Sequence, residues 1–175
     1  GTSKHEKVGA YIQDKLQNNG WLVITQQFEY DHIPLTNIIA KKGSGDSLII
    51  LGTHYDTRAV SDREREKGKQ TEPVPGANDG DSGSAVLLEL SRVLKLTENT
   101  EIWLVFFDGE DQGELNNWDW SIGAEYFVYQ LQRSPSKVLI VDMIGDKDLN
   151  VYMEMNSTDS LNKEIWGIAN KLGFQ

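Results

Sequence analysis

The alternation of apolar and polar positions divides the first part of the chain into a helix and two strands. Apolar residues at helical spacing predict a helix over Ser3–Asn19, and the following Gly20 is typical of a helix C-terminus. Period-two alternation predicts strands over Trp21–Tyr30 and Thr36–Lys41. Because the turn residues Asp31-His32 separate these strands, we expect them to form an antiparallel pair.

Largely apolar runs farther along the chain predict three strands that are buried on both faces. They cover Leu48–Leu51, Glu101–Phe107 and Lys137–Ile144, and Leu149–Met153 is compatible with a further short strand. Helices are expected after the segment PGANDGDS as far as about Lys95, over Ser121–Gln132 with Ser121 as N-cap, and over Ser157–Leu172. Because alternating strands and helices pair in parallel, we predict one α/β domain over residues 1–175. Its architecture is a three-layer sandwich with a mixed, centrally parallel sheet flanked by helices.

Composition narrows the classes of function. The net charge of −10 argues against a nucleic-acid-binding surface, which would be basic. No apolar run is long enough to span a membrane. Because the chain has no cysteine, a zinc site would have to use His, Asp and Glu side chains.

Polar side chains gather where the predicted buried strands end. The residues concerned are His54, Asp56, Asp79, Glu110, Asp111 and Asp142. Since the carboxyl ends of parallel strands meet at one edge of a sheet, we expect these side chains to converge. Taken alone, Asp79 at the start of a helix is usually a cap, but several carboxylates around one histidine repel each other unless a cation joins them. The pattern therefore predicts a divalent metal site.

The ligand set would suit one or two zinc ions. Asp79 could bridge two ions, since a carboxylate has two oxygens. His54 and Asp142 would complete one site, and Asp111 would begin the other.

Two further acidic residues, Glu110 and Asp56, would support the site without binding the metal. Glu110 is adjacent to a ligand but points elsewhere, which is the placement that a general base for water needs. Asp56 is placed to hold the second imidazole nitrogen of His54.

Four segments, GTHYDTR, PGANDGDSGSAVLLEL, FFDGED and VDMIG, resemble in order and spacing the zinc exopeptidase family twenty-eight of the metallopeptidases. This family contains leucyl-type aminopeptidases and glutaminyl cyclases. The resemblance implies zinc bound by His54, Asp79, Asp111 and Asp142, and a metal-bound water activated by Glu110. It also implies a cis Asp79–Gly80 peptide, a peptide or protein N-terminus as substrate, and an extracytoplasmic or secreted location.

Two departures from the family pattern bear on activity. The family commonly has Glu at the position of Asp111, and it supplies a last histidine ligand downstream of VDMIG. The histidines here are His5, His32 and His54. We therefore expect this chain to be the N-terminal part of a longer catalytic domain, and to be inactive or weakly metallated by itself. A non-catalytic domain with an incomplete metal site is a further alternative.

The segment Gln112–Ile122 bears on the branch of the family. Its length and its residues Trp118 and Trp120 resemble the glutaminyl cyclases, in which the two indoles would contact substrate. The alternative is that both residues anchor the loop by packing. An aminopeptidase is the leading prediction, and a glutaminyl cyclase, which forms N-terminal pyroglutamate, is the alternative.

Overall fold

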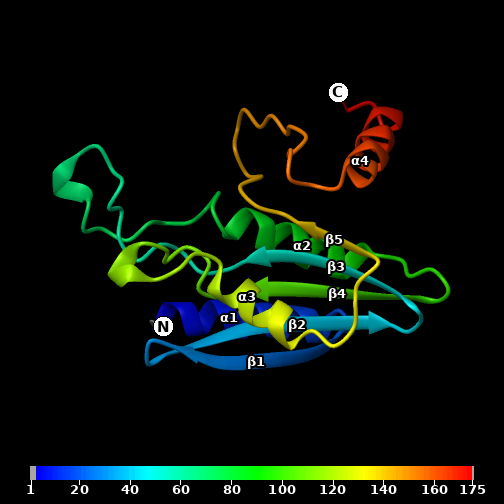
Figure 1. The fold of residues 1–175 in the computed structure, drawn as a ribbon, viewed down its shortest axis with the longest axis horizontal. Coiled ribbons are helices and arrows are strands. Elements are labelled where there is room, and N and C mark those ends of the chain that lie inside the picture. The colour runs from blue at the N-terminus through cyan, green and yellow to red at the C-terminus, as the bar shows by residue number, and fades with distance from the viewer. Residues whose placement is uncertain (1–2, 175) are drawn as a thin grey trace.

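The computed structural model describes residues 3–174, which form a five-stranded mixed sheet with helices on both faces (Figure 1). The strands are β1 (Leu22–Tyr30), β2 (Ile33–Gly43), β3 (Ser47–His54), β4 (Thr100–Phe107) and β5 (Lys137–Ile140). The helices are α1 (Ser3–Asn18), α2 (Asp81–Val93), α3 (Ile122–Gln130) and α4 (Asp159–Lys171), with short 3-10 turns at Lys67–Lys69 and Leu115–Asn117.

The sheet has the order β1-β2-β4-β3-β5. The β1–β2 and β2–β4 pairs are antiparallel, and the β3–β4 and β3–β5 pairs are parallel. In the register of the central pair, His54 lies opposite Phe107. The segments that follow β3 and β4 therefore leave the sheet side by side at one edge, where ligands bind in open α/β sheets.

Apolar residues on the two faces of the sheet explain the three layers. On one face, Ile38 and Leu104 pack against Ile12 of α1 and Leu87 of α2. On the other face, a second buried cluster surrounds Phe127 of α3. Successive strand residues point to opposite faces, so strands that are apolar at nearly every position can bury both. The predicted mixed, centrally parallel α/β sandwich is confirmed.

The predictions were less accurate toward the C-terminus. β5 ends at Ile140 rather than at residue 144, and it is not buried, because Val138 and Ile140 are 45% and 60% exposed. The short strand suggested at Leu149–Met153 is wrong, since this segment has no regular structure. Helix α4 forms near its predicted place but lies apart from the sheet (Figure 1), and none of its residues is fully buried. Within residues 3–174, no helix combines the length and apolar character needed to cross a membrane.

Candidate metal centre

One histidine and two carboxylates meet at the edge where β3 and β5 end. His54 Nε2 lies 2.9 Å from Asp79 Oδ1 and 3.3 Å from Asp142 Oδ1. His54 is the last residue of β3, Asp79 precedes α2, and Asp142 follows β5. Among residues 3–174 these three form the one group of His, Asp and Glu side chains whose ligand atoms lie within 4.8 Å of one another.

Gly80 explains how the segment before α2 comes so close to His54. A Cβ at this position would lie 2.9 Å from the backbone oxygen of Asp56 and 3.1 Å from His54 Cε1. Gly80 also has a φ of 88°, a conformation that costs glycine little. The cis Asp79–Gly80 bond that the family resemblance implied is wrong, since residues 3–174 contain no cis peptide bond.

The three side chains fit a zinc ion. Burial acts to lower the pKa of His54, but hydrogen bonds with Asp142 and Asp56 outweigh it and raise this pKa to about 11. A single Nε2–H group cannot donate a good hydrogen bond to two carboxylates at once. A bound cation would also relieve the repulsion between the carboxylates. One imidazole nitrogen and carboxylate oxygens are a usual donor set for zinc.

Asp56 lies next to His54 and is only 5% exposed. Its backbone oxygen lies 3.1 Å from His54 Nδ1, nearer than its carboxylate oxygen at 3.6 Å. The carboxylate instead accepts hydrogen bonds from the backbone N–H groups of Glu110, at 3.0 Å, and Asp111, at 3.2 Å. Asp56 therefore orients the imidazole with its main chain and fixes the acidic pair with its side chain.

Glu110 stands outside the three-residue group. Burial, together with the charges of Asp56 and Asp142, raises the pKa of its carboxyl group above the ordinary value. The Ser121 hydroxyl donates a 2.7 Å hydrogen bond to Glu110 Oε1, which opposes this shift. Ser121 stands at the N-cap position of α3, as expected, but its φ is 59° and its hydroxyl makes no cap bond with the helix.

Asp111 is half-buried, and Asp79, Asp56 and His54 are among its charged neighbours. Burial and the negative charges of Asp79 and Asp56 raise the pKa of its carboxyl group to about 6. Its carboxylate therefore feels the charge of Asp79, although it is not part of the group around His54. The structure thus brings His54, Asp79 and Asp142 together and leaves Asp111 as a neighbour of Asp79.

The two tryptophans lie on the loop after β4 with different partners. Trp118 Nε1 donates to Asp31 Oδ2 at 3.3 Å, and its ring meets Tyr30 edge to face. Trp120 covers Gly113, where an added Cβ would lie 2.1 Å from the indole. Both residues are held by packing, and Trp118 also lines a cavity of about 940 Å³ that includes Asp56.

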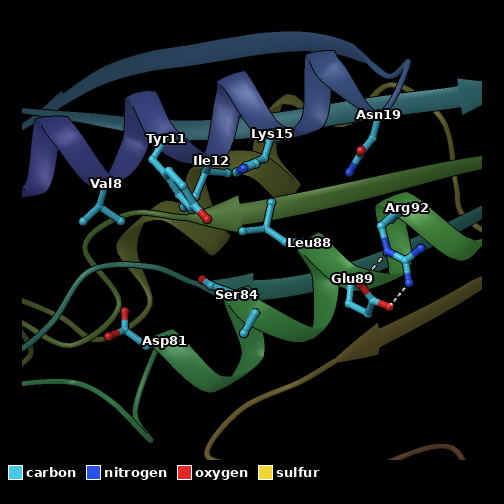
Figure 2. A pocket seen from close by; sticks show the side chains of 11 residues that line it. Val8, Tyr11, Ile12, Lys15, Asn19, Asp81, Ser84, Leu88, Glu89 and Arg92 are labelled. Carbon is cyan, nitrogen blue, oxygen red and sulfur yellow. Dashed lines mark hydrogen bonds and ion pairs between the residues drawn. The ribbon is translucent and has the colours of Figure 1, made fainter.

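A second cavity, of about 500 Å³, lies between α1 and α2 (Figure 2). The side chains of Tyr11 and Leu88 face each other across it, and the ion pair of Glu89 with Arg92 closes one end. None of the residues that line it is a proposed metal ligand. It is therefore separate from the group around His54.

At this sheet edge, the histidine and the two aspartates form a group of side chains that could hold a metal ion. The model of peptidase family M28 matches residues 37–175, and the chain belongs to this family. It is 33% identical over 139 residues to the aminopeptidase YwaD of Bacillus subtilis, covering 73% of this chain and 26% of that protein.

Two solved structures place the fold in the same group. The glutaminyl cyclase of Porphyromonas gingivalis superposes with a TM-score of 0.92 at 30% identity, covering 99% of this chain and 66% of that chain. A Zn-dependent exopeptidase of Parabacteroides distasonis gives a TM-score of 0.89 at 26% identity, with the same coverage. The chain spans less than half the length of the first curated relatives it matches, 41% and 26%.

Sequence reasoning missed two residues that support the site. Arg58 received no role in the sequence analysis, yet it is buried and donates a hydrogen bond to the backbone oxygen of Asp111. Ser121 was assigned to a helix cap rather than to Glu110. The GTHYDTR segment contains Arg58, so a basic residue just after a ligand-bearing strand was the available signal. Nothing in the spacing pointed from Ser121 to Glu110.

Proposed function

We propose that this chain belongs to a zinc-dependent aminopeptidase-like hydrolase that acts on peptide N-termini. The observation that carries the proposal is the position of Glu110. It is a half-buried carboxylate with a raised pKa, held beside three zinc-type ligands without belonging to them. That is the arrangement a general base requires.

His54, Asp79 and Asp142 would hold zinc, and Asp111 would contribute next to Asp79. A bound zinc ion supplies Lewis acidity, which makes water more acidic and polarises a carbonyl group. The carboxylate side chains would also attract the positively charged amino group of a peptide.

Among the chain's own residues, Glu110 would transfer the proton in this reaction. Glu110 would accept the proton of the attacking water at a carboxylate oxygen as the new C–O bond forms at the scissile carbonyl. It would then give this proton to the leaving amine as the C–N bond breaks, so the carboxylate is regenerated. Ser121 would keep one oxygen of Glu110 in place during both transfers.

Glutaminyl cyclisation is the second candidate. The specific observation in its favour is the 0.92 TM-score and 30% identity to the Porphyromonas gingivalis glutaminyl cyclase. In that reaction the α-amino nitrogen of an N-terminal glutamine attacks its own side-chain amide carbon and ammonia leaves. Glu110 would carry the proton from the amine to the departing ammonia.

One pair of assays distinguishes these activities. The full-length, zinc-loaded protein is given an aminoacyl anilide and, separately, a peptide that begins with glutamine. Release of the aniline supports the aminopeptidase, whereas loss of ammonia from the peptide, detected by mass, supports the cyclase. Glu110→Gln should lower the active reaction by about 10²–10⁴-fold. Absence of both activities in the zinc-loaded protein would overturn the proposal.

A further inference from the structure

The side chain of Arg58 joins the two loops that flank the metal centre. Its Nε and Nη2 atoms donate to the two carboxylate oxygens of Asp62, at 2.6 and 2.8 Å. Its Nη1 atom donates to the backbone oxygens of Asp111, at 2.9 Å, and Gly113, at 3.0 Å. Arg58 is 6% exposed, so these bonds are largely shielded from water.

The planar guanidinium is suited to this geometry. One of its edges forms a paired contact with a carboxylate, while the remaining nitrogen points at two carbonyl groups. Asp62 offsets the positive charge, so the interaction with the loop after β4 is mainly directional hydrogen bonding. A lysine ammonium lacks the fork needed to reach both groups at once.

Packing holds the same stretch of main chain from another side. The indole of Trp120 lies against Gly113, at a place where a Cβ would come within 2.1 Å. The guanidinium of Arg58 lies 5.1 Å from the centre of that indole, within the range of a cation–π contact. The backbone at residues 111–113 is therefore enclosed by Arg58 and Trp120.

Both main-chain polar groups of Asp111 are thus fixed by buried charged side chains. Its N–H donates to Asp56 Oδ2 at 3.2 Å, and its carbonyl accepts from Arg58 at 2.9 Å. With both peptide groups held, the direction in which the Asp111 side chain leaves the backbone is set.

We propose that Arg58 is a positioning residue for Asp111, and that it keeps the Asp111 carboxylate beside Asp79 for metal binding. This inference rests on the proposed function, in which Asp111 contributes to zinc binding. Arg58 itself touches neither metal nor substrate. Replacing Arg58 should therefore weaken the binding of the zinc ion that depends on Asp111.

The test measures zinc content and zinc affinity in the full-length protein, prepared metal-free and titrated at buffered free zinc concentrations. Asp111→Ala first identifies the zinc that depends on Asp111. Arg58→Lys keeps the charge and most of the stem, so it avoids leaving Asp62 without a cation. We expect it to weaken the Asp111-dependent zinc by about 10–100-fold, the usual effect of disturbing a ligand's support.

Arg63→Lys is the matched control. Arg63 lies 5.3 Å from the centre of the same indole and pairs with Glu114, and among residues 3–174 it has no hydrogen bond to the carbonyl of Asp111 or Gly113. Its zinc affinities should equal those of the wild type. Thermal unfolding of all variants, recorded without metal, separates loss of zinc from loss of fold.

Each result has a defined meaning. Weaker Asp111-dependent zinc in Arg58→Lys, with normal affinity in Arg63→Lys, supports the positioning role. If Asp111→Ala loses zinc but Arg58→Lys binds it normally, the positioning role is overturned and the proposed function stands. If Asp111→Ala keeps all its zinc, both the positioning role and the assignment of Asp111 as a ligand are overturned, whereas the activity assays still test the proposed reaction.

Discussion

The carboxylate of Asp56 accepts a hydrogen bond from the backbone N–H of Glu110 over a distance of 3.0 Å. Its second oxygen accepts from the next amide, that of Asp111, at 3.2 Å. Because its own backbone oxygen lies 3.1 Å from His54 Nδ1, one buried residue connects the histidine at the end of β3 with the acidic pair after β4. The relative placement of the proposed ligand and the proposed base therefore depends on Asp56.

Asp56→Asn should damage both stability and activity. The amide NH₂ group would face one of the two backbone N–H groups, and an unsatisfied buried donor costs about 1–3 kcal/mol. We expect a loss of this size in the free energy of unfolding, measured with urea, and a fall of about 10–100-fold in kcat/KM.

Asp46→Asn is the control for this change, because Asp46 is an exposed aspartate just before β3 at the opposite end of the strand. It should leave both quantities at their wild-type values. Equal behaviour of the two variants would contradict the role given to Asp56.

Ser121→Ala should shift the pH dependence of activity. The Ser121 hydroxyl donates to the charged form of Glu110 and so lowers the pKa of a carboxyl group that burial raises. Without that bond the pKa of Glu110 rises. Since the base acts when deprotonated, the acid limb of the kcat/KM profile should move to higher pH.

The control for this profile is Ser136→Ala, which removes a hydroxyl that donates to the backbone oxygen of Leu48, remote from the site. Its acid limb should coincide with that of the wild type. A shift of the Ser121→Ala profile to lower pH would be the wrong sign for the proposed base.

Zinc binding should release a proton from His54. Hydrogen bonds with Asp142 and Asp56 raise the pKa of His54 to about 11 in the metal-free protein, so at pH 7 the ring is protonated. Zinc requires a neutral imidazole nitrogen, and the proton must leave when the ion binds. Calorimetry in buffers of different ionisation enthalpy should detect about one released proton for the zinc that His54 binds.

His32→Asn serves as the control, because the His32 side chain is 95% exposed and pairs only with Glu29 among its described contacts. The proton count should not change in this variant. A binding enthalpy that is independent of the buffer would show that His54 does not lose a proton to the ion.

Two helical glycines test how closely α2 must approach the sheet. A Cβ at Gly83 would lie 2.2 Å from Thr53 Oγ1 and 2.5 Å from the backbone oxygen of Val141, whereas a Cβ at Gly167 in α4 would meet nothing within 4 Å. Gly83→Ala should therefore destabilise by about 1–3 kcal/mol. Gly167→Ala should stabilise by about 0.5–1 kcal/mol, because alanine favours helices. Urea unfolding of both variants measures the difference, and equal effects would contradict the close packing of α2.

The sequence was a good guide where local pattern and burial agree. Leu48–Leu51 and most of Glu101–Phe107 are apolar because β3 and β4 lie inside the sheet with helices on both faces. The same reasoning overextended Lys137–Ile144, because an aliphatic run can also belong to a short strand paired on one side only. β5 pairs with β3 for four residues and then leaves the sheet.

The sequence also predicted some residues of the candidate site and not the contacts of others. The strand-end rule led to His54, Asp79 and Asp142, which the structure brings within 4.8 Å. The contacts made by Asp108 and Ser121 could not be foreseen. Asp108 follows β4 as expected, but it bonds to the backbone N–H of Thr36 and lies 3.1 Å from His5 Nε2. These partners are remote in sequence and become neighbours only when the layers assemble.

The most direct test of the metal centre is anomalous diffraction at the zinc edge from crystals of the zinc-loaded, full-length protein. The structure leads us to expect a peak at about 2.0–2.2 Å from His54 Nε2 and from carboxylate oxygens of Asp79 and Asp142, with Glu110 outside this coordination. A zinc peak coordinated by Glu110, or no peak beside His54, would contradict the account.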